Sequence, residues 1–359
     1  MNLHKYVVIL TIVLISVSAS LSLPRFSART GISCQGCHIN PSGGGMRNYY
    51  GTVFYGRQTL PVKKWFDSFE ISNFTSKINE FVSIGADFRT LFYYVEKTRS
   101  SSFYQMQGDI YANLKIAEGV SMYIDKGLYK GFEIFGLMNI LPENGYIKVG
   151  RFTPVFGTKT DDHTNFIRAK TVFQNNRAED SGIEAATAPG NFAVTVGLFN
   201  GASSGDLSDS KIRLLTGNAD ARFKIEEINF SIGSSLWFNS LSSGIMRMFG
   251  GYGSINYINI TVNGEIDLKQ DKSILGLGTK ELISLVELNY LLFDGLDLKF
   301  MYDYYDYDIR YKTGFESRYS FGFEFFPISG VEVRPVYRLS QDRNKNKNNE
   351  INFLIHFYL

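Results

Sequence analysis

The sequence is poor in several residue types, and each scarcity removes a class of protein. With two cysteines and four histidines, no further Cys or His follows at the spacing that a zinc site needs. The 37 lysines and arginines nearly balance the 35 aspartates and glutamates, so we expect no nucleic-acid partner. After residue 23 no apolar run is long enough for a membrane-spanning helix. Eight prolines against thirty phenylalanines and twenty-two tyrosines indicate an aromatic-rich β-protein.

Residues 1–23 are typical of a secretory signal peptide. Lys5 supplies the positive charge, residues 6–17 form the apolar run, and Val17-Ser18-Ala19 is a small-residue cleavage site. The alternative is an uncleaved membrane anchor, for which the apolar run is short. We therefore expect a protein that is exported to the periplasm, to the outer membrane or out of the cell.

The two cysteines lie in Cys34-Gln35-Gly36-Cys37-His38, the C-x-x-C-H pattern by which c-type haem is attached. Each thiol can bond one haem vinyl group, and the adjacent histidine can serve as the proximal ligand of the iron. The pattern therefore predicts one covalent haem c on Cys34 and Cys37, with His38 as the iron ligand. A disulfide and half of a zinc site are the alternatives.

From about residue 77 apolar and polar side chains alternate, as they do along strands with one apolar face. We count about sixteen such segments, joined alternately by tight turns and longer polar loops, which is the plan of an outer-membrane barrel. The clearest segments are 82–88, 104–116, 228–238, 260–268, 315–325 and 331–339. Tight turns are expected at 117–119, 141–145, 188–190, 225–227, 293–295 and 327–330, and longer loops at 97–102, 153–180, 200–209, 270–279 and 341–350.

The end of the chain agrees with this plan, because alternation continues from Ile351 to the final residue, Leu359. The predicted fold class is therefore all-β: an outer-membrane antiparallel barrel of about 16 strands, preceded by a short c-type haem segment. Apolar residues would face lipid and polar residues the lumen. A soluble β-sandwich or a large lipocalin-like barrel is the alternative. We divide the chain into a signal peptide (1–23), a haem segment (24–66) and the barrel (67–359).

The haem segment has about forty residues, which is near the lower limit for a domain that folds alone. A barrel of about sixteen strands leaves an aqueous channel. We therefore expect the segment to form a plug inside that channel or at its periplasmic mouth. Ser42-Gly43-Gly44-Gly45 would then allow the backbone to approach the haem or the barrel wall closely, unless it is simply a flexible loop.

Three residues are candidates for the distal ligand of the iron. His163 lies in the longest expected loop, and in porins such a loop can fold into the channel. Met46 follows the haem motif closely. His356 alternates with Phe357 and so faces the lumen near the periplasmic rim. Each of them can also be an ordinary packing, loop or lumen residue, so all three remain candidates.

Carboxylates and tyrosines alternate at residues 302–308, where Tyr302-Asp303-Tyr304-Tyr305-Asp306-Tyr307-Asp308 runs from a strand into an outer loop. Carboxylate oxygens suit a hard cation such as Fe(II). The alternative is an aromatic girdle at the membrane interface, beside a solvated loop.

Pro24-Arg25-Phe26-Ser27-Ala28-Arg29-Thr30-Gly31, leading into the C-x-x-C-H pattern, resembles the start of the fused monohaem cytochrome–porins in the outer membrane of iron-oxidising bacteria. That resemblance implies a haem on Cys34 and Cys37, His38 as proximal ligand, and a barrel of about this size. Separately, Val149-Gly150-Arg151-Phe152-Thr153-Pro154-Val155-Phe156-Gly157 is similar to an element of phosphate-selective-type porins, which supports the barrel.

Together these patterns favour an electron conduit across the outer membrane. Electrons would pass between an extracellular donor or acceptor, such as Fe(II), and a periplasmic c-type cytochrome or another carrier. Such a protein could be an electron-transfer oxidoreductase. No arrangement of residues for hydrolytic or transferase chemistry is present. The alternatives are a diffusion porin with a structural or redox-responsive haem plug, and a soluble haem-binding β-protein.

Overall fold

The computed structural model describes residues 25–62, 75–128, 131–173, 178–201, 213–241, 244–311 and 314–359. The expected signal peptide and the expected boundary between residues 66 and 67 lie outside these ranges. Both therefore remain predictions.

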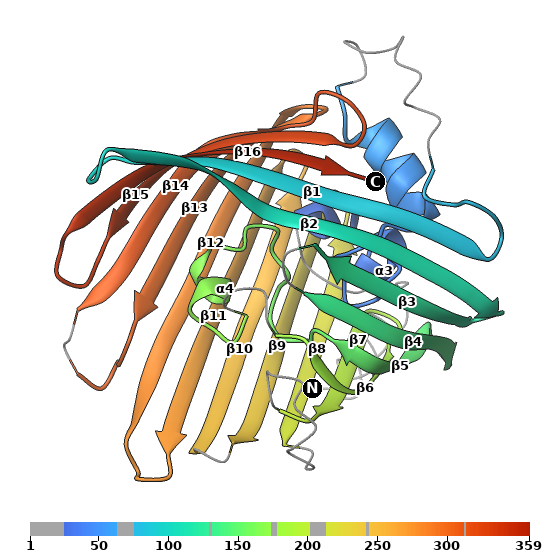
Figure 1. Cartoon of the computed structure of the whole chain (residues 1–359), viewed down its shortest axis with the longest axis horizontal. Helices are drawn as coiled ribbons and strands as arrows, with labels where there is room; N and C mark the ends of the chain where they lie inside the picture. The colour runs from blue at the N-terminus through green and yellow to red at the C-terminus, as the bar shows by residue number, and fades with distance from the viewer. Residues whose placement is uncertain are drawn as a thin grey trace, which may run out of the picture.

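The chain forms a closed antiparallel barrel in which each strand pairs with its sequence neighbours and β1 pairs with β16 (Figure 1). This arrangement confirms the predicted all-β antiparallel barrel and the predicted strand number. The strands are β1 (Val82–Val95), β2 (Ser100–Ala117), β3 (Val120–Gly127), β4 (Phe132–Leu141), β5 (Gly145–Phe152), β6 (Asp180–Thr187), β7 (Phe192–Phe199), β8 (Leu214–Ile225), β9 (Ile228–Leu241), β10 (Gly244–Tyr257), β11 (Ile260–Ser273), β12 (Gly278–Phe293), β13 (Leu296–Asp306), β14 (Phe315–Phe325), β15 (Val331–Gln341) and β16 (Lys347–Tyr358).

Within the described residues, four short helical elements are separate from the barrel wall. Three precede the barrel: α2 (Arg25–Thr30), α3 (Cys34–Cys37) and the π-helical η1 (Tyr50–Thr59). The fourth, α4 (Phe166–Ala169), lies in the connection between β5 and β6. None of the described helices has the length and apolar character needed to cross a membrane.

The wall has an apolar outer face because its side chains alternate with a period of two. In β1, Phe88 is 42% exposed on the outside, whereas its neighbours Asp87 and Arg89 are 5% and 9% exposed inside. The same alternation runs through β11, β14 and β15. Closure satisfies the backbone groups of the edge strands, as a bilayer requires. The predicted location in the outer membrane is thereby confirmed.

The expectation of a uniformly polar lumen is wrong on one side of the barrel. Tyr111, Tyr123, Phe135, Phe152 and Phe199 point inward from five strands and are almost completely buried. Successive ring centroids are between 4.9 and 6.5 Å apart, so the rings form a continuous inner band. Aromatic side chains bury well only against other surfaces. This band is therefore a docking face for chain that enters the lumen.

All six predicted tight turns connect strands, but three predicted longer loops are shorter in the structure. The connections between β1 and β2, β11 and β12, and β15 and β16 are only 96–99, 274–277 and 342–346. The strand ends on either side are rich in polar residues because they extend beyond the apolar band. Polar strand ends and polar loops cannot be distinguished by hydrophobic alternation.

The final strand closes the barrel to the end of the chain. The backbone N–H of Leu359 donates to the carbonyl oxygen of Ala86 at 2.9 Å. His356 pairs with Arg89 in register, and its side chain points into the lumen as predicted.

Candidate cofactor site inside the barrel

Residues 25–47 of the N-terminal segment lie against the inner wall of the barrel, whereas η1 lies at the rim near the C-terminus, with Tyr50 and Phe54 exposed (Figure 1). Helix α2 packs beside β9, β10 and β11. Arg29 forms an ion pair with Asp297 at 2.5 Å, and Asn229 donates to the carbonyl oxygen of Arg29 at 3.0 Å. At the other end of the segment, the N–H of Val62 donates to the carbonyl oxygen of Phe326 at 3.0 Å. The segment is therefore a plug, which we define as residues 25–62.

Helix α3 is a single turn that holds the C-x-x-C-H pattern. The Ser33 hydroxyl accepts a hydrogen bond from the N–H of Gly36 at 3.2 Å, as an N-cap does. At the other end the N–H of His38 donates to the carbonyl oxygen of Cys34 at 2.7 Å. Residues three apart lie on one face of a helical turn. Cys34 and Cys37 therefore lie on the same turn, and no disulfide joins them.

A tight loop follows the motif and needs its glycines. His38 and Arg47 form a β-bridge, so residues 38–47 fold back on themselves. Gly43 has φ = +84°, and a Cβ there would lie 2.5 Å from Cys34 Sγ. Gly45 has φ = +64°, and a Cβ there would collide with the hydroxyl of Tyr123. The predicted close approach of the backbone to the barrel wall is confirmed.

The His38 ring has the form that a metal ligand needs. Its Nδ1 lies 3.3 Å from the carbonyl oxygen of Gly45. Because a carbonyl only accepts, Nδ1 carries the proton and Nε2 holds the lone pair. Burial, and then the charge of Arg47, lower the pKa of His38 to about 4. The ring is therefore neutral at neutral pH. Burial also raises the pKa of the Cys37 thiol to about 11.

The connection between β5 and β6 folds into the barrel, and we call residues 153–173 of it the inward loop. Its helix α4 packs Phe166 and Ile167 against buried side chains of β12 and β13. Two aspartates fix its position: Asp161 pairs with Arg334 and Asp162 with Arg338, each at 2.7 Å. The Asp162–Arg338 pair is largely buried, whereas the Asp161 side chain is 40% exposed, and together the two pairs tie the loop to the inner face of β15.

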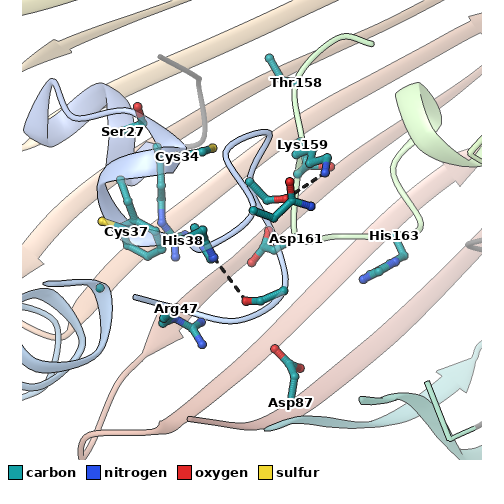
Figure 2. Close-up of a pocket in the computed structure, with 18 of the residues that line it drawn as sticks. Ser27, Cys34, Cys37, His38, Arg47, Asp87, Thr158, Lys159, Asp161 and His163 are labelled. Atoms are coloured by element: carbon teal, nitrogen blue, oxygen red, sulfur yellow. Dashed lines mark hydrogen bonds between the residues drawn. The ribbon is translucent and has the colours of Figure 1, made fainter. Parts of the chain in front are cut away.

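The inward loop and the plug also contact one another. Figure 2 shows Lys159 and Asp161 of the loop facing the stretch that carries Cys34, Cys37 and His38. Lys159 donates to the carbonyl oxygen of Gly43 at 2.8 Å. From the wall, Lys148 donates to the Ser42 hydroxyl at 2.8 Å and pairs with Glu184 at 2.7 Å, fully buried.

The structure separates the three candidates for a distal ligand. Met46 is completely buried in the aromatic band, packed with Tyr111 and Tyr123, and does not line the cavity beside His38. His356 lines the cavity, but its Nε2 lies 3.0 Å from Asp87 and its Nδ1 2.8 Å from Glu332. His163 also lines the cavity, with its Nε2 3.5 Å from Arg89 Nη1.

The residues present fit a covalently attached haem. Cys34, Cys37 and His38 line one cavity of about 340 Å³, which is within the size range of cofactor sites. In the described parts of the chain, the one cluster of three metal-ligating side chains is Asp161, Glu324 and Glu332, and it includes neither cysteine. Arg334 and Lys299 lie beside that cluster and form ion pairs with its carboxylates.

The tyrosine–aspartate run of β13 is divided between the two faces of the wall. Tyr302 packs against Tyr319 at a centroid distance of 4.7 Å on the outer face. Asp303 is fully buried inside, where it accepts hydrogen bonds from Arg318 and from the N–H of Phe166. The arrangement favours the aromatic-girdle interpretation over a cation-docking site.

Sequence reasoning missed the charged residues that surround the cavity. Asp87, Arg89 and Arg25 line it together with the haem motif. Alternation indicated that Asp87 and Arg89 face inward. No local sequence pattern could show that these residues lie beside residues of the plug.

Comparison with known proteins identifies the fold. No protein-family model and no curated protein match this chain. OmpT of Vibrio cholerae aligns with 78% of this chain and 100% of its own, at 12% identity and a TM-score of 0.61. OprB of Pseudomonas putida aligns over 78% and 94%, at 10% identity and a TM-score of 0.66. The anion-selective porin from Comamonas acidovorans aligns over 77% and 99%, at 12% identity and a TM-score of 0.57.

The chain thus has the fold of outer-membrane porins. At such low identity the likeness establishes the fold alone.

Proposed function

We propose that this protein carries one haem c on Cys34 and Cys37, with His38 as proximal ligand, and passes electrons across the outer membrane through its barrel. The proposal also relies on the resemblance of the N-terminal residues to the fused cytochrome–porins. The observation that carries it is the position of the C-x-x-C-H turn inside the lumen of the barrel. A redox group there would be reached from both faces, since the apolar band of such barrels is about 25 Å tall.

The protein's own residues would hold and enclose the group. Cys34 and Cys37 supply thiols on one turn, and the Gly45 carbonyl orients the His38 ring. When bound, the haem supplies one-electron exchange. The plug and the inward loop occupy the lumen on either side of the cavity, which limits the passage of solutes and water. The partners would be a periplasmic c-type cytochrome or similar carrier and an extracellular donor or acceptor, with Fe(II) among them.

A second candidate is a diffusion porin whose plug carries the haem. The observations that favour it are the porin fold and the many charged side chains on the inner wall, such as Arg318, Arg334 and Arg338. Solutes would then pass beside the plug, or after the plug has moved. Electron transfer would not be the main activity.

One reconstitution distinguishes the two candidates. The purified full-length protein is inserted into sealed liposomes that contain an impermeant electron acceptor and a trapped dye. Fe(II) or another impermeant donor is added outside, and absorbance of haem and acceptor is followed together with dye release. The matched control is the Cys34→Ala/Cys37→Ala variant, which keeps the barrel.

Reduction of the acceptor without dye release, absent in the control, is the expected result. Dye release with a haem that does not change its redox state would establish the porin instead. A wild-type protein that carries no covalent haem on a denaturing gel would overturn both forms of the proposal.

A further inference from the structure

Buried hydrogen-bond donors without an acceptor are rare in folded proteins, and each one calls for an explanation. Two arginines that line the cavity beside the haem motif have such donors. They are Arg25, on helix α2 of the plug, and Arg168, on helix α4 of the inward loop.

Arg25 is only 4% exposed, yet only one of its three guanidinium nitrogens has a partner in the part of the chain that the structure describes. One nitrogen, Nη2, pairs with Glu324. Within the described residues, Nε and Nη1 have no hydrogen-bond partner. Glu324 also pairs with Lys299 at 2.9 Å and with Arg334 at 3.3 Å, both through Oε1. Two donors of this buried cation therefore have no acceptor among the described residues.

Arg168 is in a similar situation on the inward loop, which contacts the plug. Its Nη1 donates to the carbonyl oxygen of Thr160 at 3.2 Å, whereas its buried Nε has no partner among the described residues. The nearby Asp161 and Asp162 are already paired with Arg334 and Arg338. Burial, and then the charge of Arg89, lower the pKa of Arg168 to about 10. Its charge is thus incompletely compensated.

The other unpartnered side-chain atoms of described residues that line the cavity are Glu332 Oε1, His356 Nε2, Gln107 Oε1, Asn263 Oδ1 and the Tyr358 hydroxyl oxygen, and none belongs to an arginine. Glu332 Oε1 lies 3.5 Å from Arg334, and His356 Nε2 lies 3.0 Å from Asp87, so each has a complementary polar group close by. Gln107 Oε1 is an acceptor. What the described cavity wall lacks is an acceptor for two arginines, and the group that arginine binds best is a carboxylate or a phosphate.

We propose that Arg25 and Arg168 form a binding site for the carboxylates of the bound cofactor, namely the two propionates of the haem. This inference rests on the proposed function. The site lies on the two elements that meet at the cavity, the plug and the inward loop. Binding one ligand through both would lock them together. The same chemistry could instead serve a small carboxylate solute that diffuses through the barrel, and the test distinguishes these two sources.

The test is a potentiometric titration of the haem-loaded full-length protein. Arg25→Gln and Arg168→Gln are compared with two controls, Arg57→Gln on η1 of the plug and Lys170→Gln next to α4. Neither control residue lines the cavity, and Lys170 already pairs with the wall carboxylate of Glu316. Covalent haem is quantified on denaturing gels for every variant. Arg25→Lys keeps the charge and serves if Arg25→Gln does not assemble.

A positive charge beside an ionised propionate stabilises the reduced haem, so its loss lowers the midpoint potential. We expect each test variant to shift the one-electron equilibrium about tenfold, or about 59 mV, and each control to shift it much less. Succinate added to the wild type should leave the potential unchanged. Haem-loaded test variants with the wild-type potential would overturn the inference and leave the proposed function standing.

Two further outcomes would lead to different conclusions about the site. If succinate binds to the haem-loaded wild type and not to Arg25→Gln, the site serves a diffusing carboxylate, and the assignment to propionates is wrong. If the wild type carries no covalent haem, the proposed function fails, and this inference fails with it.

Discussion

Lys159 Nζ donates a hydrogen bond to the carbonyl oxygen of Gly43 at 2.8 Å, and this bond joins the inward loop to the plug. Gly43 also lies against the sulfur of Cys34. A single contact therefore links the loop that narrows the lumen with the turn that carries the haem motif. The two elements are mechanically coupled at this point.

Lys159→Met should loosen that coupling. A net loss of about 1 kcal/mol, typical of one hydrogen bond, corresponds to about a fivefold larger population in which loop and plug are separated. Hydrogen–deuterium exchange of the amides in residues 38–46 measures this population. Lys126→Met, which changes an exposed lysine on β3, is the control. Equal exchange in the two variants would show that the bond does not hold the elements together.

Gly45→Ala and Gly44→Ala form a matched pair. Both glycines have positive φ, which costs an alanine about 1–2 kcal/mol. A Cβ at Gly45 also collides with Tyr123, whose hydroxyl accepts a hydrogen bond from the N–H of Met46, whereas a Cβ at Gly44 meets nothing within 4 Å. We expect Gly45→Ala to cost about 1–3 kcal/mol more. Denaturant midpoints of the folded protein in detergent test this difference, which would be absent if the plug did not dock on Tyr123.

Substitutions of Met46 and of His163 should have different effects on the haem absorption spectrum. Met46→Leu conserves volume and should cost less than about 1.5 kcal/mol, whereas Met46→Ala leaves a cavity that costs about 2–5 kcal/mol. Neither should alter the haem absorption spectrum, because the Met46 side chain packs in the aromatic band. His163→Ala should alter it, since carboxylates already engage both ring nitrogens of His356. An altered spectrum in Met46→Leu would instead favour Met46 over His163 as the distal ligand.

Asp162→Asn should release part of the inward loop. Removing one partner of the buried pair with Arg338 costs about 3–5 kcal/mol. The exposed Asp294→Asn is the control. Single-channel conductance measures the effect, and the variant should show larger or noisier currents than the wild type. Identical currents in variant and wild type would show that the loop does not restrict the lumen.

The same pair predicts a pH dependence. Burial opposes ionisation of Asp162, but Arg338, Arg334 and Arg318 outweigh it and hold its pKa well below the usual value. The stabilisation is complete above the ordinary aspartate pKa, about 3.9, and is lost only as the pH falls through the depressed value. Conductance should therefore be constant from pH 7 to about pH 5. A change of state within that range would contradict the assignment.

Most of the barrel could be predicted from the sequence because alternation reports directly which face of a strand is buried. Asp87, Phe88 and Arg89 illustrate this: their order alone indicates which side chains point inward. The inner aromatic band could not be predicted. Tyr111 follows the outward Ile110, and an aromatic residue on a face expected to be polar has no local signal until the plug is seen to cover it.

The site was predictable only in its local part. The C-x-x-C-H pattern specifies a turn with two thiols and a histidine, and the structure forms that turn. The surroundings of the turn depend on contacts between residues more than a hundred positions apart, such as Lys159 with Gly43. The expected role of His356 as a ligand candidate illustrates the limit, because its two carboxylate neighbours come from β1 and β15.

The ion pair between Lys148 and Glu184 lies on the inner wall directly beneath Ser42 of the plug, and neither side chain is exposed. Without residues 25–62 the side of this pair that contacts Ser42 would face the open lumen. Entry of the plug is therefore the step that dries this part of the barrel, and the aromatic band that Met46 enters helps to drive it. The wall of this barrel is thus suited to two environments, one wet during assembly and one dry afterwards.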